Sequence, residues 1–266
     1  MTSIAVGIIG AGIMGEALLA AILKSGVPAS SIAISDKRSE RTSDLSAKYG
    51  CKVLTSYEIV EQATNILLVV KPQDMDELLQ KIGKNVSDGK RIVSFAAGKR
   101  TASIEKLLSK NCPVLRVMPN TPMSVGVGAS AISKGTFATN EDVKAVEELL
   151  KSSGKTIVVE ESLQDAVTAT SGSGPAYFFK FIEAMIEGAQ ELGLSASDAK
   201  TLVIQTLAGA AEMLNEEGAS PAKLRENVTS PNGTTFAALK TFDEGGITEL
   251  VKKAMRAARD RSQELS

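Results

Sequence analysis

The sequence predicts two domains of different class: an α/β domain with a mostly parallel sheet over residues 1–160, followed by an all-α domain over 161–266. Two observations lead to this prediction. Up to about residue 160, short apolar runs rich in Val and Ile alternate with amphipathic stretches, an order typical of parallel sheets with helical crossovers. Beyond that point the chain shows helical periodicity and almost no sign of strands.

The first domain begins with a predicted strand at 4–9 and a predicted helix at 13–24, and the alternation continues from there. Short runs that are apolar throughout are typical of strands buried on both faces of a sheet. Further strands are predicted at 32–35, 66–70, 91–95, 114–118, 128–132 and 155–159, and further helices at 39–49, 103–109 and 141–151.

The second domain is predicted to hold helices at 176–192, 196–214, 236–242 and 247–261. These segments are rich in alanine and contain several methionines. A helical region with so many small apolar positions is expected to bury part of its surface against another subunit. The alternative is a self-contained helical bundle.

Composition excludes several functional classes. The 266 residues are 43% hydrophobic and 23% charged, with a net charge of −1 and no apolar run as long as a membrane span, so neither nucleic acid nor a membrane is an expected partner. The absence of histidine excludes imidazole bases, Ser-His-Asp systems and the common zinc sites. Cys51 and Cys112 suggest neither a disulfide framework nor a metal cluster, which favours the reducing cytoplasm.

The segment Gly10-Ala11-Gly12-Ile13-Met14-Gly15 lies between a predicted strand and a predicted helix. In that context a G-x-G-x-x-G pattern indicates a Rossmann-like, dinucleotide-binding domain. Gly10 permits the tight turn, Gly12 lets the backbone approach the pyrophosphate, and Gly15 lets helix and strand pack closely. The helix N-terminus supplies free N–H groups to the phosphates.

The second predicted strand ends in Ser35, Asp36, Lys37 and Arg38, where the adenosine ribose is read. Asp36 lies 21 residues after Gly15, and an acid at that place binds a ribose 2′-hydroxyl and favours NAD. The cations beside it, together with the serine, suit a 2′-phosphate instead. We therefore expect NADPH as the preferred cofactor, with NADH as an alternative.

Ligands of open α/β sheets bind outside the carboxyl ends of the strands. Three further strand ends should therefore line the cofactor site. The residues concerned are Val70, Lys71 and Pro72 after one strand, Ala96, Ala97 and Gly98 after the next, and Asn120 after the third. Asn120 stands in the stiff loop Met118-Pro119-Asn120-Thr121-Pro122, and its amide is expected where the nicotinamide ring lies.

Two segments of the helical half carry candidates for the substrate site. The stretch 170–177 interrupts a helical run, with Pro175 placed to start a new helix and Ser173 to cap it. The loop 229–235, Thr-Ser-Pro-Asn-Gly-Thr-Thr, precedes a helix, where free N–H groups and hydroxyls form a candidate carboxylate site. The structural alternatives are a plain helix kink and ordinary capping by Thr234 or Thr235.

Together these segments resemble pyrroline-5-carboxylate reductase along essentially the whole chain, on the residues 10–15, 117–122, 170–177 and 228–235. The resemblance implies reduction of the cyclic imine 1-pyrroline-5-carboxylate to L-proline by hydride transfer from NAD(P)H, the last step of proline biosynthesis. It also implies a homodimer or larger homo-oligomer, in which the helical half of one subunit closes the site of another.

The resemblance further implies roles for individual residues. Thr235 would be the catalytic residue, with its hydroxyl near the ring nitrogen as a hydrogen-bond partner and proton relay. The family usually has Gly-Gly where this chain has Asn232-Gly233, and Asn tolerates left-handed backbone geometry better than most residues. The implied substrate-binding residues are Ser173, Ser230, Asn232, Gly233, Thr234 and Thr235.

Two other functions are compatible with the glycine motif. A 3-hydroxyacid dehydrogenase-like oxidoreductase would use a lysine in a glycine-rich segment of the helical half, where Lys180 is only a loose candidate. A non-enzymatic NADP-sensing protein is expected to have lost the 229–235 loop, which this chain keeps. Imine reduction also fits the absence of histidine, because an imine is protonated readily and demands little acid–base catalysis.

Overall fold

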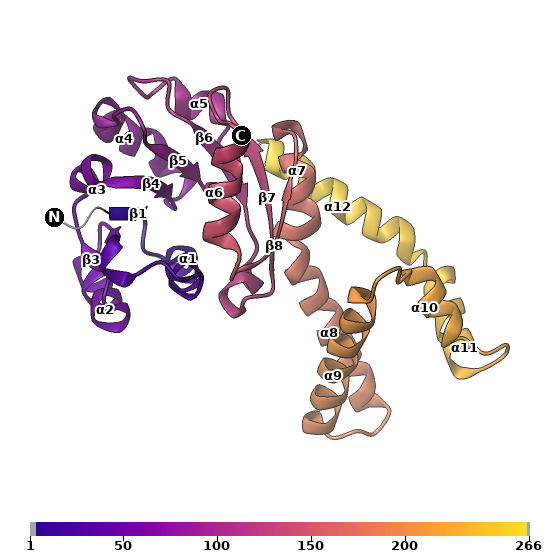
Figure 1. Cartoon of the computed structure of the whole chain (residues 1–266). Coiled ribbons are helices and arrows are strands. Elements are labelled where there is room, and N and C mark those ends of the chain that lie inside the picture. The colour runs from indigo at the N-terminus through magenta and orange to yellow at the C-terminus, as the bar shows by residue number, and fades with distance from the viewer. Residues whose placement is uncertain (1–3, 265–266) are drawn as a thin grey trace. The chain divides into compact units, whose positions relative to one another are not determined.

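The computed structural model describes residues 4–264 (Figure 1). The chain divides into two compact units, one formed by the residues up to 175 together with those from 258 onward, and the other by 176–257. None of the helices in the described part of the chain has the length and apolar character needed to cross a membrane.

The first unit is built on one sheet of eight strands, in the order β3-β2-β1-β4-β5-β6-β7-β8. All neighbours pair in parallel except β6 and β7, which are antiparallel, so the prediction of a mostly parallel sheet is confirmed. The strands are β1 (Ile4–Ile9), β2 (Ile32–Ser35), β3 (Lys52–Val53), β4 (Ala63–Leu68), β5 (Arg91–Ser94), β6 (Val114–Met118), β7 (Gly128–Lys134) and β8 (Gly154–Val158).

Helices cover both faces of this sheet (Figure 1). One face packs against α1 (Ile13–Lys24), α2 (Ser39–Tyr49) and α6 (Asn140–Leu150), which bury Leu18, Leu45 and Val146 among others. The opposite face packs against α3 (Ser56–Gln62), α4 (Pro72–Ile82) and α5 (Thr101–Glu105), through Ile59, Leu79 and Ile104. Short 3₁₀ turns connect the elements at η1 (Ala29–Ser31), η2 (Gly83–Asn85), η3 (Thr121–Val125) and η4 (Glu161–Leu163).

Several predicted bounds shift in the structure. The strand predicted at 66–70 is β4, which begins at Ala63 and ends at Leu68. The helix predicted at 103–109 is α5, which ends at Glu105 because the hydrogen bonds after it close turns of three residues, from Leu107 to Ile104 and from Leu108 to Glu105. Strand β3 was not predicted, since two residues are too short a run to show periodicity.

Strands give way to helices after β8, near the predicted domain boundary at residue 160, but the first turns beyond it pack on the sheet. In α7 (Gln164–Val167), the fully buried Gln164 donates to the Ser133 hydroxyl of β7 at 2.8 Å. One turn of π-helix, η5 (Thr168–Gly172), follows. The compact units therefore divide after Pro175 and not where the strands end.

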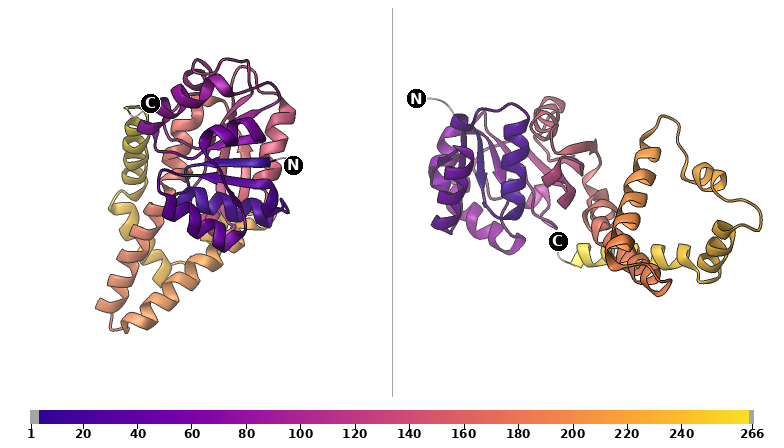
Figure 2. Two further views of the ribbon diagram at one scale, coloured as in Figure 1. Left: turned by 90° about the vertical axis from the view of Figure 1, so that its left-hand side faces the viewer. Right: turned by 90° about the horizontal axis from the view of Figure 1, so that it is seen from below.

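The second unit is entirely helical. Figure 2 shows α8 and α9 leaving their connecting turn in different directions. Across residues 176–257, all of which the structure describes, Ala199 and Val203 alone are buried. Large apolar side chains are exposed instead, among them Phe178 at 59% and Leu202 at 56%. The helices are α8 (Gly174–Glu191), α9 (Ala196–Asn215), α10 (Pro221–Asn227), α11 (Thr234–Glu244) and α12 (Ile247–Glu264); α10 was not predicted.

Candidate functional site

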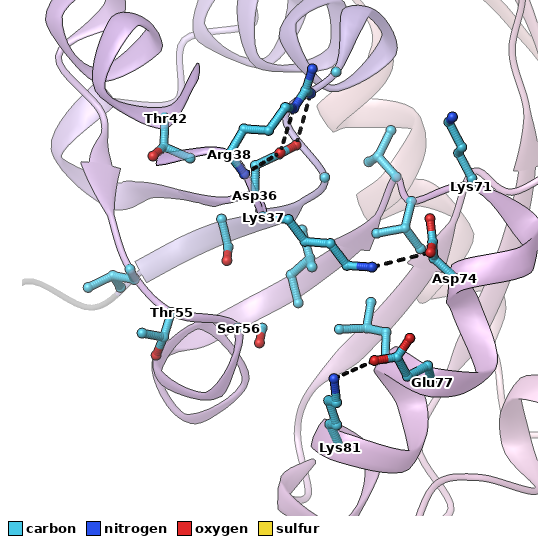
Figure 3. A pocket seen from close by; sticks show the side chains of 18 of the residues that line it. Asp36, Lys37, Arg38, Thr42, Thr55, Ser56, Lys71, Asp74, Glu77 and Lys81 are labelled. Atoms are coloured by element: carbon cyan, nitrogen blue, oxygen red, sulfur yellow. Dashed lines mark hydrogen bonds and ion pairs between the residues drawn. The ribbon is translucent and has the colours of Figure 1, made fainter. Parts of the chain in front are cut away.

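A cleft of about 1050 Å³ lies at the carboxyl ends of β1, β2 and β4, between the glycine turn and α4 (Figure 3). Because these strands are parallel, their carboxyl ends meet at one edge of the sheet, and the residues that follow them come together. The predicted cofactor residues that line the cleft are Gly10, Gly12, Ser35, Asp36, Lys37, Arg38, Val70 and Lys71.

The glycine turn has the backbone geometry that the motif requires. Gly10 has a φ of +105°, and a Cβ at this position would lie 2.6 Å from the Val69 carbonyl oxygen. A Cβ on Gly15 would lie 2.1 Å from the Gly10 carbonyl oxygen, so helix and turn pack closely only because the side chain is missing. At Gly12 the same construction meets nothing within 4 Å, which leaves the approach to the turn open.

Helix α1 begins directly after this open glycine. Its N-cap is Gly12, which has no side chain, so no N-cap side chain bonds the N–H groups of the first turn. These groups and the helix dipole attract an anion. Beside them Ile13 is 87% exposed, and Met14 follows it in the first turn. The turn therefore fits a dinucleotide pyrophosphate.

The Asp36 carboxylate faces the glycine turn. Its Oδ2 accepts the Ala11 N–H at 2.7 Å. Its Oδ1 accepts both the Arg38 N–H and the Arg38 Nε–H at 3.0 Å (Figure 3). Burial by itself would raise the pKa of Asp36, but the hydrogen bonds from Arg38 and Ala11 outweigh it and hold the pKa below its usual range. Asp36 is thus an ionised group already engaged by its own chain.

Two cations stand at the mouth of the cleft. The Arg38 side chain is 63% exposed and is held by Asp36, while the Lys37 side chain is 78% exposed and lies 3.2 Å from the Asp74 carboxylate of α4. Ser35 and Ser39 line the cleft on either side of them. Because both cationic side chains are mostly exposed, they can meet a phosphate in the cleft, which suits a ribose 2′-phosphate.

Arg41 also holds the glycine turn in place, and no sequence pattern pointed to it. Its Nε donates to the Ala11 carbonyl at 3.0 Å, so the Ala11 peptide is held from both sides, by Asp36 on its N–H and by Arg41 on its oxygen. Arg41 also pairs with Glu16 in the first turn of α1. The spacing along the chain gives no sign of this contact, because Arg41 reaches the turn only when α2 packs beside α1.

The far side of the cleft is formed by α3 and α4, which sequence patterns also missed. The Thr55 hydroxyl caps α3 by accepting the Glu58 N–H at 3.2 Å, and the Glu58 carboxylate accepts the Thr55 N–H at 2.8 Å. Such a Thr-x-x-Glu capping box is readable in a sequence and could have located this helix start. Further lining residues are Val53, Leu54, Ser56, Asp74, Glu77, Leu78 and Lys81.

The remaining predicted cofactor residues lie outside the lining of this cleft. Pro72 is the first residue of α4, and Ala96, Ala97 and Gly98 follow β5, where Gly98 has a φ of +75°. Asn120 follows β6, and the protein itself engages both ends of its amide: Oδ1 accepts the Ala129 N–H at 2.8 Å, and Nδ2 donates to the Ser171 carbonyl at 3.2 Å.

Ser173 lies directly after the π-helical turn. Its N–H donates to the Thr168 carbonyl at 2.8 Å, the five-residue spacing of a π-helix. Helix α8 starts at Gly174, with Pro175 as its second residue. The predicted interruption of the helix at 170–177 is thus present as a π turn and not as a capped break.

The loop 229–235 belongs to the second unit. Asn232 has a φ of +58° and is the one residue other than glycine with a positive φ in the described part of the chain. Gly233 closes a turn by donating to the Ser230 carbonyl at 3.0 Å, and a Cβ on Gly233 would lie 3.1 Å from that oxygen. Asn232 therefore adopts the left-handed backbone that a Gly-Gly pair would supply.

Helix α11 begins at Thr234, and its N-cap Gly233 makes no side-chain hydrogen bond. The first-turn N–H groups therefore have no side-chain cap, and the exposed Thr234 and partly exposed Thr235 stand beside them. The Thr229 hydroxyl donates to the Arg225 carbonyl at 2.6 Å and ties the start of the loop to α10. This arrangement fits a carboxylate. No group of His, Cys, Asp and Glu suited to a metal ion occurs among the described residues.

Two family models match the chain. One, described as pyrroline-5-carboxylate reductase dimerisation, matches residues 161–265, and the other, described as NADP oxidoreductase, coenzyme F420-dependent, matches residues 5–98. A pyrroline-5-carboxylate reductase from Corynebacterium melassecola is 40% identical over 269 residues, covering 100% of this chain and 99% of its own. One from Methanosarcina acetivorans is 41% identical and covers 98% of this chain and 97% of its own.

Solved structures agree over the same extent. A pyrroline-5-carboxylate reductase from Coxiella burnetii has a TM-score of 0.93 at 33% identity, covering 100% of this chain and 99% of its own. A pyrroline carboxylate reductase from Plasmodium falciparum, crystallised with NADP bound, has a TM-score of 0.87 at 28% identity with the same coverage.

Proposed function

This chain belongs to the pyrroline-5-carboxylate reductase family, and we propose how its two units share the reaction. The chain reduces 1-pyrroline-5-carboxylate to proline with reduced NAD(P), and it acts as a homo-oligomer. The first unit holds the cofactor and the 229–235 loop of the second holds the substrate. Membership of this family decides against the dehydrogenase and sensor alternatives.

The residues of the first unit fit the dinucleotide. The open position at Gly12 and the first turn of α1, which no side chain caps, would hold the pyrophosphate, while Arg38 and Lys37 would meet a 2′-phosphate. The reduced nicotinamide supplies the hydride that the imine carbon accepts. NADPH is the cofactor that we propose as preferred, because the Asp36 carboxylate is already engaged by Ala11 and Arg38.

The residues of the 229–235 loop would hold the substrate at two points. First-turn N–H groups of α11, with the Ser230 and Thr234 hydroxyls, bind the carboxylate. The Thr235 hydroxyl donates a hydrogen bond to the ring nitrogen and relays the proton that this nitrogen gains when the C=N bond is reduced. A threonine hydroxyl is a weak acid, so a water molecule behind it is the proton source.

The assembled enzyme must bring the two binding regions together, because hydride transfer requires the reacting atoms to approach to roughly 3–3.5 Å. We propose that the helical unit of one subunit completes the active site of another. The exposed apolar side chains of 176–257 support this proposal, since they need a partner surface. We also propose a cytoplasmic location, because Cys51 and Cys112 are buried and free.

The test is the loss of reduced-nicotinamide absorbance when the purified full-length chain meets 1-pyrroline-5-carboxylate, with NADPH and NADH compared side by side. Rapid oxidation that depends on the imine is expected, and the rate with NADPH should exceed the rate with NADH. If the protein binds NADPH and NADH but oxidises neither in the presence of the imine, the proposed division of the reaction between the two units is wrong.

A further inference from the structure

The π-helical turn η5 contains a backbone carbonyl that an ordinary helix could not satisfy. In an α-helix the Ser171 carbonyl would accept the N–H of residue 175, but that residue is Pro175, which has no N–H. The Ser173 N–H is bonded to the Thr168 carbonyl at 2.8 Å. A single π turn inside a helix is uncommon, and such turns frequently occur at functional sites.

Asn120 supplies the donor that Pro175 lacks. Its Nδ2 donates to the Ser171 carbonyl at 3.2 Å, across 51 residues of sequence. On its other side Oδ1 accepts the Ala129 N–H of β7 at 2.8 Å, and this bond fixes which way the amide points. The amide therefore bridges two backbone segments, the beginning of β7 and the π turn.

A second contact joins the π turn to the neighbouring strand β6. The Met118 Cε lies 2.6 Å from where a Cβ of Gly172 would stand, so the Met118 side chain at the end of β6 packs closely against the glycine. The hydroxyls of Thr168 and Ser171 bond backward to the carbonyls of residues 164 and 167, at 2.9 and 3.2 Å. The π turn is thus held both by hydrogen bonds within its own helical segment and by contacts from the sheet.

We propose that Asn120 is a positioning residue for the substrate side of the active site: by taking the place of the N–H that Pro175 lacks, it fixes the π turn and with it Ser173. This inference rests on the proposed function and on the substrate contact that the family resemblance implies for Ser173. The expected contact of the Asn120 amide with the nicotinamide ring stays a prediction, and the bonds of Oδ1 and Nδ2 to the backbone give this amide a structural role beside it.

The sharpest variant is Asn120→Asp, which keeps the acceptor for Ala129, replaces the donor to Ser171 by an oxygen atom and adds a negative charge. The chain offers a matched control, Asn65→Asp, in which the same change removes a donor to the Ala5 carbonyl (2.9 Å) and keeps the acceptor for Arg91. Each full-length variant is assayed for the KM of the imine, for kcat and for the Kd of NADPH. Hydrogen–deuterium exchange of the segment 168–175 is measured alongside.

Asn120→Asp is expected to raise the KM for the imine about tenfold, as loss of one partly buried hydrogen bond allows, with the NADPH Kd changed less than about twofold. Hydrogen–deuterium exchange within 168–175 should become faster, while exchange in the glycine turn stays as slow as in the wild type. Asn65→Asp should leave KM and the exchange of 168–175 as they are. An NADPH Kd that weakens in step with KM, or unchanged exchange in the π turn, would overturn the proposal.

A double-mutant cycle with Pro175→Ala tests the cause directly. Alanine restores the missing N–H, so Asn120→Asp should cost less in the Pro175→Ala background, about threefold or below in KM. An equal cost in both backgrounds overturns the inference. If Asn120→Asp does not give folded protein, Asn120→Ala takes its place in the cycle. A wild-type chain without imine-dependent oxidation would refute the proposed function, whereas the exchange measurement would still decide the role of Asn120.

Discussion

At the scale of single residues, Asn232 shows how a departure from the family pattern is tolerated. The family resemblance leads us to expect glycine at this position, and Asn232 takes a φ of +58°. Asparagine adopts this region at a smaller steric cost than other residues with a Cβ. The turn from Ser230 to Gly233 is therefore kept, and its first-turn N–H groups stay available for a carboxylate.

Thr235→Ala is the first prediction at this scale. If the Thr235 hydroxyl bonds the ring nitrogen in the transition state, its removal should lower kcat/KM roughly 10²–10³-fold. Steady-state kinetics with saturating NADPH measures this loss. Thr229→Ala is the control, because the Thr229 hydroxyl is bonded to the Arg225 carbonyl and is expected to matter far less. A Thr235→Ala enzyme with wild-type kcat/KM would exclude the proton-relay role.

Arg38→Ala is the second. Arg38 carries the exposed charge that we assign to the 2′-phosphate, and charge-assisted hydrogen bonds are stronger than those between neutral groups. The Kd of NADPH should therefore weaken about tenfold or more, while the Kd of NADH changes little. Fluorescence titration with both nucleotides measures the ratio. Equal losses for the two would mean that Arg38 acts through Asp36 on the glycine turn, and not on the phosphate.

At the scale of elements, one carboxylate joins α1 to α2. Glu16 in the first turn of α1 accepts the Lys48 Nζ at 2.9 Å and the Tyr49 hydroxyl at 3.0 Å, and it pairs with Arg41. The hydrogen bonds from Lys48 and Arg41 lower the pKa of Glu16 to about 2. Because Arg41 also holds the Ala11 carbonyl, this cluster links helix packing to the shape of the glycine turn.

The depressed pKa predicts how stability depends on pH. A carboxyl whose pKa falls from 4.5 when unfolded to about 2 when folded stabilises the fold above pH 4.5 and loses that contribution as the pH falls towards 2. Glu16→Gln should therefore destabilise the protein by about 1–2 kcal/mol near neutral pH, less than the full shift implies because Glu16 is partly in solvent.

Urea unfolding between pH 7 and about pH 3 measures this prediction, and the difference between wild type and Glu16→Gln should shrink as the pH falls below the unfolded pKa. The exposed Glu40→Gln, in the first turn of α2, is the matched control and should differ little from wild type at any pH. A pH-independent difference for Glu16→Gln would mean that packing, and not charge, accounts for its effect.

At the scale of the whole molecule, the two units differ in how they are stabilised. The first has apolar clusters on both faces of its sheet, whereas the second leaves most of its large apolar side chains exposed. A folded monomer rarely leaves so much apolar surface in water. We therefore expect the homo-oligomer to be a condition for the stability of the helical unit as well as for activity.

Ile204→Glu should break the assembly. Ile204 is 47% exposed on α9, and burying a glutamate against an apolar partner surface costs several kcal/mol. Light scattering after size-exclusion chromatography should show a smaller species, and activity should fall with it. Gln205→Glu, one residue further along the same helix, introduces the same side chain at a polar position and serves as the control. An active Ile204→Glu monomer would refute a site completed by a partner subunit.

Much of the first unit could be predicted because its structure is encoded locally. Helices α1 and α2 have the bounds that the apolar periodicity predicts, and the glycine turn lies at the end of β1. The segments that line the cleft follow from the same alternation, since parallel strands bring their carboxyl ends to one edge. Helices α3 and α4 also border the cleft, and only the fold places their side chains there.

The α/β and all-α classes, the dinucleotide turn and the family could be predicted from the amino-acid sequence, because each depends on residue type at a fixed local spacing. The tertiary structure determines which distant backbone groups bond the side chains of Asp36, Arg41 and Asn120, since these partners lie 25, 30 and 51 residues away in the sequence. A polar side chain that the sequence suggests as a ligand contact is free to bind the ligand only if no backbone group of the folded protein is already bonded to it. That competition is settled by packing, which no local pattern records.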